Sequence, residues 1–149
     1  MKRVIAAIGL TVFMAGAATA EETTWSGNIK GIVEKQCFGC HGPDSAPEYP
    51  QFKKEKGKWL EKGLAMRMDT YSHLVAYVGW PNTGAMMRRL DDGKGAKDGK
   101  PGNMYQHLGD TEAERQKNLG QFKSWVGNWS LKRLPESTKE DLSGIKVKY

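Results

Sequence analysis

Residues 37–41 of this 149-residue chain have the sequence Cys37-Phe38-Gly39-Cys40-His41. Two cysteines separated by two residues and followed at once by a histidine form a C-x-x-C-H pattern. At this spacing, each thiol can add across one vinyl group of a porphyrin and form a thioether. The histidine then falls beneath the central iron as its proximal ligand. The stretch therefore predicts one covalently attached c-type haem, held by Cys37, Cys40 and His41.

Three other uses of such a cysteine pair fit the sequence less well. A thioredoxin-like redox pair belongs to a βαβ pattern, which is absent here. A four-ligand zinc site needs further Cys or His nearby, but the chain has only these two cysteines, and His73 and His107 are far apart. A disulfide across two intervening residues would close a tight, strained loop. Haem attachment remains the favoured interpretation.

The first twenty residues have the pattern of a secretory signal. Lys2 and Arg3 supply positive charge, residues 4–16 are apolar, and Ala18-Thr19-Ala20 offers small residues for cleavage before Glu21. The apolar run is too short to span a bilayer, and an uncleaved membrane anchor is the alternative. Because c-type haem is attached outside the cytoplasm, the signal and the motif together predict a periplasmic protein.

Chain length and charge limit the remaining possibilities. The exported chain is long enough for one domain with one core, which we expect at residues 21–134, followed by a polar C-terminal tail at 135–149. The formal net charge is +6, and two of these charges belong to the predicted signal. This excess is too small to indicate nucleic-acid binding, but a mildly positive face can steer the protein towards acidic redox partners.

Hydrophobic spacing predicts helices and no sustained strand, so we expect an all-α fold wrapped around the haem. A first helix at residues 26–36, capped by Ser26 or Thr24, would carry both cysteines to the core. Residues 52–68 are helix-compatible and lysine-rich. Their lysines form either a solvated face or a docking patch.

Later elements follow from local signals. Helices are expected at residues 70–78 and 84–90, followed by a glycine-rich surface loop at 91–103. The last helix begins at Thr111, where Glu114 completes a capping box. It should end near residues 131–134, before a proline.

The sixth iron ligand decides the type of function. A thioether ligand raises the potential, and a filled site favours outer-sphere electron transfer, whereas an open site permits small-molecule chemistry. The candidates beyond the signal are Met66, Met68, Met86, Met87 and Met104. Because methionine is usually core filler, the surroundings of each must decide.

Met104 is the favoured ligand, because it lies in the loop segment Pro101-Gly102-Asn103-Met104 shortly before the final helix. Such a loop can bring one sulfur across the haem face. Met86 or Met87 is the main alternative, since the pair also follows a turn with Pro and Gly. Met66 and Met68 are expected within a helix. A histidine or an open site is the remaining possibility.

The order of these features resembles a class I-type monohaem cytochrome c. The matching parts are the helix before the motif, the residues Cys37, Cys40 and His41, the loop ligand Met104 and the aromatic final helix around Trp125. The resemblance implies a His/Met iron and a shuttle role in the periplasm. Tyr105 follows Met104 where the family usually has proline. More narrowly, the chain resembles periplasmic monohaem cytochromes of metal- and electrode-respiring bacteria.

We therefore expect a one-electron carrier that is not an enzyme and has no catalytic residues. Its partners would be other cytochromes or a respiratory complex. We expect a monomer with no stable membrane insertion. The alternatives are a haem enzyme or gas or redox sensor with an exchangeable sixth ligand, and a haem subunit of a respiratory complex.

Overall fold

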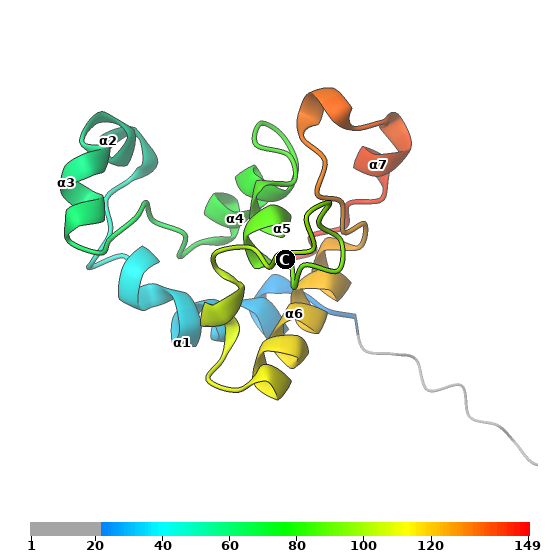
Figure 1. Cartoon of the computed structure of the whole chain (residues 1–149), viewed down its shortest axis with the longest axis horizontal. Coiled ribbons are helices and arrows are strands. Elements are labelled where there is room, and N and C mark those ends of the chain that lie inside the picture. The colour runs from blue at the N-terminus through cyan, green and yellow to red at the C-terminus, as the bar shows by residue number, and fades with distance from the viewer. Residues whose placement is uncertain (1–21) are drawn as a thin grey trace, which may run out of the picture.

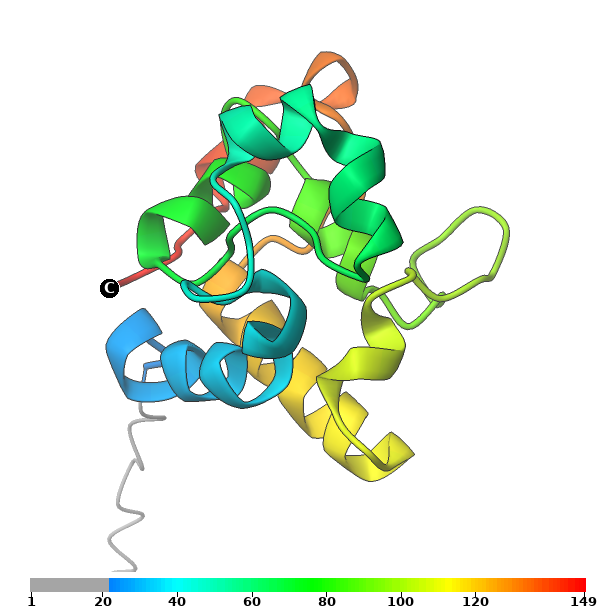
Figure 2. The same cartoon turned by 90° about the vertical axis from the view of Figure 1, so that its left-hand side faces the viewer.

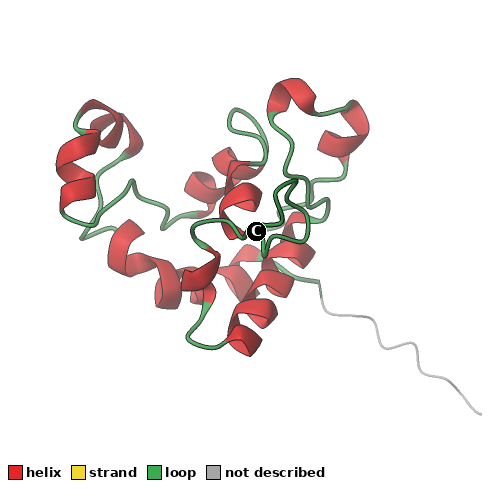
Figure 3. Ribbon diagram, viewed as in Figure 1, coloured by secondary structure: helices red, strands yellow, loops and turns green. Residues whose placement is uncertain are grey.

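The computed structural model describes residues 22–149, so the predicted signal peptide lies outside the described residues. Within this part the chain is helical and has no strand, which confirms the predicted all-α class (Figure 3). No helix of residues 22–149 is both long and apolar enough to cross a membrane. The helical elements are η1 (Trp25–Ile29), α1 (Lys30–His41), α2 (Tyr49–Lys54), α3 (Lys56–Glu61), α4 (Tyr71–Val78), α5 (Ala85–Leu90), η2 (Tyr105–Leu108), α6 (Glu112–Val126), η3 (Leu134–Glu136) and α7 (Lys139–Ser143).

The first helix is longer than predicted, because it continues through the haem motif. The Thr24 hydroxyl, one of the two predicted caps, accepts a hydrogen bond from the Gly27 amide at 3.0 Å. A π-helical turn, η1, then leads directly into α1, which ends at His41 and not at residue 36. Gly42 leaves the helix with extended backbone (φ −78°, ψ 168°). Both cysteines and His41 therefore lie on one regular helix.

Two short helices and an extended segment replace the single helix expected at residues 52–68. α2 ends at Lys54 and α3 at Glu61. The chain then turns at Gly63 with φ +69°, a conformation that glycine adopts without strain. The chain then runs beside the end of α1, where the Ala65 amide donates to the Cys40 carbonyl at 3.2 Å. The prediction that Met66 and Met68 lie within a helix is therefore wrong.

The next two helices agree with the sequence. α4 and α5 occupy the residues predicted for them. The Thr70 hydroxyl caps α4 by accepting a hydrogen bond from the His73 amide. Gly84 precedes α5 with φ +72°, and an added Cβ there would lie 2.2 Å from the Lys132 carbonyl oxygen. This turn therefore requires glycine, because the backbone of residues 130–132 packs too closely for a side chain.

The last long helix, α6, starts as predicted and ends early. The Thr111 hydroxyl accepts from the Glu114 amide at 3.2 Å. The Glu114 carboxylate, however, accepts from the Asp110 amide at 3.0 Å, so only half of the expected capping box forms. The helix ends at Val126 and not near residues 131–134, because Gly127 takes φ +80° and reverses the chain.

The segment expected to be a polar tail folds back onto the core after α7. The Lys146 amide donates to the Val126 carbonyl at 2.9 Å, and the Trp125 indole Nε1 donates to the Lys148 carbonyl at 2.7 Å. Ile145 and Val147 pack against the buried core. The domain boundary at residue 134 stays a prediction about independent folding.

One hydrophobic core lies where η1, α1, α4, α5, η2 and α6 meet. Trp25 and Trp125 pack with ring centroids 6.3 Å apart. In Figures 1 and 2, α2 and α3 lie on the far side of the molecule from α6, with α1 between them. The end of α1 that carries the haem motif therefore lies near α2 and α3, whereas its beginning packs in the core. The fully or largely buried members of the core are Trp25, Ile29, Val33, Leu74, Val78, Met86, Met87, Tyr105, Leu108, Leu119, Phe122, Trp125 and Val126.

Candidate haem-binding site

The two cysteines of the motif lie on the C-terminal half of α1 and are both free thiols. Cys37 packs against the hydrophobic core, whereas Cys40 is exposed. Burial, with a smaller effect of the neighbouring Cys40, raises the pKa of the Cys37 thiol to about 11. No group of three or more metal-ligating side chains occurs within residues 22–149. The arrangement therefore favours neither a disulfide nor a zinc site.

The imidazole of His41 is oriented by the extended segment beside α1. Its Nδ1 atom lies 2.7 Å from the Met66 carbonyl oxygen. A carbonyl can only accept a hydrogen bond, so Nδ1 carries the proton and Nε2 keeps its lone pair free. The Met68 amide donates to the His41 carbonyl at 3.0 Å, which fixes the same segment from the other side. This tautomer is the one that a metal-ligating histidine needs.

Trp59, on α3, provides a direct test of whether a haem fits. Its indole Nε1 is buried and has no hydrogen-bond partner among the described residues. Leaving a buried donor unpaired costs about 1–3 kcal/mol, so the indole calls for an acceptor that the polypeptide does not supply. The Leu64 amide donates to the Trp59 carbonyl at 3.0 Å, which ties Trp59 to the segment that orients His41. A porphyrin carboxylate is an acceptor of the right chemistry, so the residues present fit the group.

The positive charge around this indole agrees with the same interpretation. The Lys58 and Lys62 ammonium groups lie 5.8 Å and 5.4 Å from the centroid of the Trp59 ring. Both lysines belong to the predicted basic segment. They place two cations beside a buried donor that lacks an acceptor among residues 22–149, where carboxylates would be favoured. Sequence reasoning did not single out Trp59 as a site residue, since no motif marks it and only the tertiary structure buries its N–H.

The methionines differ clearly in their surroundings. Met86 and Met87 are 5% and 1% exposed and belong to the core. Met68 packs against that core. The Met66 carbonyl is bound to Nδ1 of His41, which places its backbone on the side of the imidazole turned away from Nε2. Met104 is half-buried and is not part of the core.

The backbone around Met104 is fixed against the end of α5. The Met104 amide donates to the Arg89 carbonyl at 2.9 Å, and the Arg89 guanidinium donates to Asn103 Oδ1 at 2.8 Å. An added Cβ at Gly102 would lie 2.3 Å from the carbonyl oxygens of Arg88 and Arg89, so this approach requires glycine. The helix that follows, η2, contacts α1. Met104 thus precedes an element that packs on the haem-motif helix.

The two other histidines have different environments. His73 is a satisfied polar residue on α4, with Nδ1 3.1 Å from Asp69 and Nε2 3.3 Å from Glu48. Arg67 also binds Asp69 at 2.7 Å, and its hydrogen bond holds the pKa of the Asp69 carboxyl below its usual value. His107 is exposed on η2, beside Gln106.

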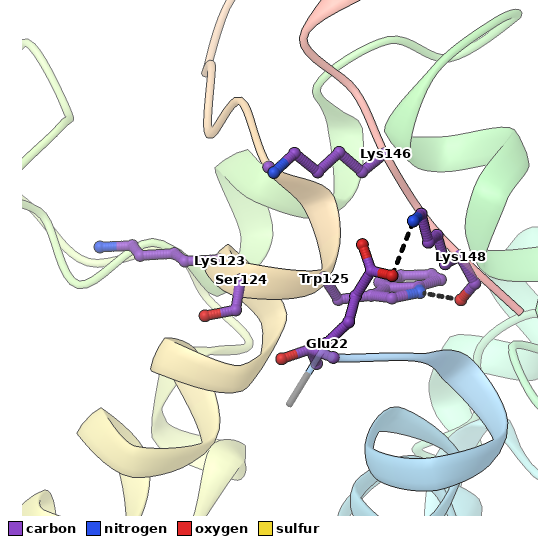
Figure 4. A pocket seen from close by; sticks show the side chains of 8 residues that line it. Glu22, Lys123, Ser124, Trp125, Lys146 and Lys148 are labelled. Atoms are coloured by element: carbon purple, nitrogen blue, oxygen red, sulfur yellow. Dashed lines mark hydrogen bonds and ion pairs between the residues drawn. The ribbon is translucent and has the colours of Figure 1, made fainter. Parts of the chain in front are cut away.

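Two surface pockets lie elsewhere. One of about 440 Å³ is lined by Lys123, Trp125, Lys146 and their neighbours. Figure 4 shows that Glu22 pairs there with Lys148, at 2.6 Å. A second, of about 830 Å³, lies between the loop of residues 95–102 and residues 128–133. Neither is lined by the haem motif or by Met104.

Two comparisons with known proteins find a match. A family model described as "PccH Cytochrome c" matches residues 24–149. Among solved structures, the chain is similar to the monoheme cytochrome PccH from Geobacter sulfurreducens, with 62% sequence identity and a TM-score of 0.79. That match covers 86% of this chain and 99% of the other. A comparison with curated proteins finds no match.

Proposed function

Because this chain belongs to the PccH cytochrome c family, we propose that it is a periplasmic one-electron carrier with His41 and Met104 as axial ligands. The family implies one covalently bound c-type haem with iron and an electron-carrier role. When bound, the haem supplies a one-electron ferric/ferrous couple. The polypeptide holds the group, orients its ligands and limits its contact with water.

The hydrogen bond between His41 and Met66 is the observation that carries this proposal. It fixes the ring orientation and leaves Nε2 available for iron. Because the acceptor is a main-chain carbonyl, the bond does not depend on the conformation of the Met66 side chain. A proximal ligand held in this way needs little rearrangement on electron transfer.

In the proposed axial pair, Met104 would supply the thioether and His41 the imidazole. This role of Met104 is supported by the position of its loop beside α5 and by the half-exposed state of its side chain. The side chains of Met86 and Met87 are buried in the core. The backbone of Met66 is bound at the wrong side of His41. A thioether stabilises ferrous iron relative to a second imidazole and so raises the potential.

Trp59 and its lysine neighbours would receive a haem carboxylate. The indole Nε1 would donate a hydrogen bond, which removes the cost of an unpaired buried donor. Lys58 and Lys62 would offset the negative charge. Burying or pairing that charge keeps it from stabilising ferric iron, so these residues help to set the potential.

The partners follow from the carrier role. We propose that they are other periplasmic cytochromes or a respiratory complex and that the chain acts as a monomer. The basic residues of α2 and α3 lie beside the motif end of α1 (Figure 1). An acidic partner would therefore be steered towards the side of the molecule where Cys40 is exposed.

Spectra of the ferric protein test the axial pair. Wild-type protein should show the weak far-red band that accompanies methionine–iron bonding, and Met104→Ala should lose it. Met86→Leu is the matched control, since it removes a thioether from the core with little change in volume, and it should keep the band. Retention of the band in Met104→Ala would exclude Met104. Rapid carbon monoxide binding by the reduced wild-type protein would instead favour an enzyme or sensor with an exchangeable ligand.

A further inference from the structure

The loop that leads to Met104 needs an anchor. Residues 91–103 contain no helix or strand, and Figure 2 shows the loop projecting from the rest of the fold. An iron ligand must be held closely in place to keep its bond against water or an external ligand. Backbone contacts with Arg89 fix one side of Met104. The contacts on the other side of Met104 come from the residue that follows it.

Tyr105, the next residue, is turned into the protein and is 7% exposed. Its hydroxyl donates a hydrogen bond to the Glu112 carboxylate and accepts one from Gln116 Nε2 at 2.7 Å. Both partners lie in the N-terminal part of α6. A long capped helix is one of the most rigid elements of the fold, so these bonds connect the residue after Met104 to a fixed support.

The same cluster also holds the beginning of the loop. Gln116 Nε2 donates to Asp92 Oδ2 at 3.2 Å. The Asp92 side chain is 3% exposed and is also paired with Lys94 at 2.9 Å. Asp92 opens the loop and Tyr105 follows its end, so both ends converge on one side chain of α6. A loop closed at its base in this way loses much of its freedom, although its tip projects into solvent.

We propose that Tyr105 is a positioning residue for the sixth ligand. Its hydroxyl, held by Gln116 and Glu112, keeps the Met104 loop against α6 and so keeps the thioether on the iron. This inference rests on the proposed axial role of Met104. Proline at this position would stiffen the backbone but would supply no hydroxyl. In this chain, the side-chain hydrogen bond of Tyr105 therefore restrains the Met104 loop in place of a rigid proline ring.

Imidazole binding to the ferric holoprotein measures how firmly the methionine is held. Tyr105→Phe removes only the hydroxyl, so the haem stays attached and the far-red band remains. Imidazole should bind about tenfold more tightly, since one hydrogen bond to a charged group contributes about 1.5 kcal/mol. Tyr71→Phe is the matched control: Tyr71 is half-buried, and its hydroxyl donates to the Val147 carbonyl at 2.7 Å, away from the ligand loop. That variant should lose stability and leave imidazole affinity unchanged.

A second variant covers the case in which Tyr105→Phe fails to fold. Gln116→Leu removes the donor that connects Tyr105 and Asp92, and it should also raise imidazole affinity. Combining the two changes should give less than the product of their separate effects, because they break one network.

Three results would overturn the inference, and they differ in their meaning. Unchanged imidazole affinity in Tyr105→Phe, with an open iron in Met104→Ala, would remove the positioning role and leave the axial pair intact. An unchanged spectrum in Met104→Ala would remove the axial role itself, and the positioning role with it. An equal effect of Tyr71→Phe would show that affinity only follows stability, which also contradicts the proposal.

Discussion

His41 Nδ1 lies 2.7 Å from the Met66 carbonyl oxygen, so a methionine orients the histidine of the haem motif through its main chain. The side chain of Met66 has no part in this contact. The relationship connects the haem motif of α1 to a segment that sequence patterns assigned to a helix. Because it holds the Met66 backbone on the Nδ1 side of the imidazole, this contact also counts against Met66 as the sixth ligand.

Replacing Met66 by alanine should leave axial ligation unchanged, because the carbonyl that binds His41 is retained. We expect the far-red band to persist and the reduction potential to shift little. Absorption spectra and a redox titration of the ferric and ferrous forms measure this. Loss of the band in Met66→Ala, with its retention in Met104→Ala, would make Met66 the sixth ligand in place of Met104.

Trp59→Phe should lower the reduction potential by about 20–60 mV. Phenylalanine keeps an aromatic ring but removes the donor, so a haem carboxylate would keep more of its negative charge and favour ferric iron. The magnitude is that of one hydrogen bond, because a tenfold change in an equilibrium constant corresponds to 59 mV for a one-electron couple. Trp80→Phe is the control, because Trp80 is 77% exposed. Equal potentials in both variants would show that Trp59 binds no carboxylate.

Acid should loosen the Tyr105 cluster between about pH 4.5 and pH 2. The hydrogen bond from Tyr105, followed by those from Gln116 and Arg115, lowers the pKa of Glu112 to about 2. A carboxyl whose pKa is lowered in the folded state stabilises it above the ordinary value, and this stabilisation is lost as the pH falls through the folded value. Burial alone would raise the pKa of Asp92, but bonds from Lys94 and Gln116 outweigh it and hold the pKa at about 2.

Unfolding midpoints of the holoprotein from pH 5 to pH 2 measure this effect. Glu112→Gln should flatten part of the decline, since it removes one of the two carboxyl groups of the Tyr105 cluster that titrate in this range. A curve of unchanged shape in Glu112→Gln would show that the cluster does not contribute to acid sensitivity.

Deleting residues 145–149 should lower the free energy of unfolding by about 2–4 kcal/mol. This is the scale expected for the loss of buried apolar side chains together with their hydrogen bonds. Ile145 and Val147 leave the core, and Trp125 loses the acceptor at Lys148. Urea unfolding of the holoprotein gives the value, with Lys139→Ala on the exposed part of α7 as the control. Unchanged stability would support a domain that ends at residue 134.

Sequence patterns predicted the features that depend on neighbouring residues. The haem motif is set by spacing alone, and Thr24, Thr70 and Thr111 cap helices through amides three residues away. The ends of helices were predicted less well. Gly63 and Gly127 end them through backbone conformations with positive φ, and these depend on where the chain must go next.

Long-range contacts account for what the sequence did not predict. The return of residues 145–148 to the core is built from main-chain hydrogen bonds, which leave no pattern in the sequence. The unpaired indole of Trp59 and the convergence of Tyr105 and Asp92 on Gln116 likewise exist only after folding. The axial assignment of Met104 stays a prediction.

The reduction potential of Met104→Ala is the most direct test of the central claim that His41 and Met104 hold the iron. If they do, losing the thioether should lower the potential by roughly 0.1–0.2 V, well within the span of about 0.8 V over which axial ligands act. Met86→Leu, measured beside it, should stay at the wild-type value. A wild-type potential in Met104→Ala would contradict the account.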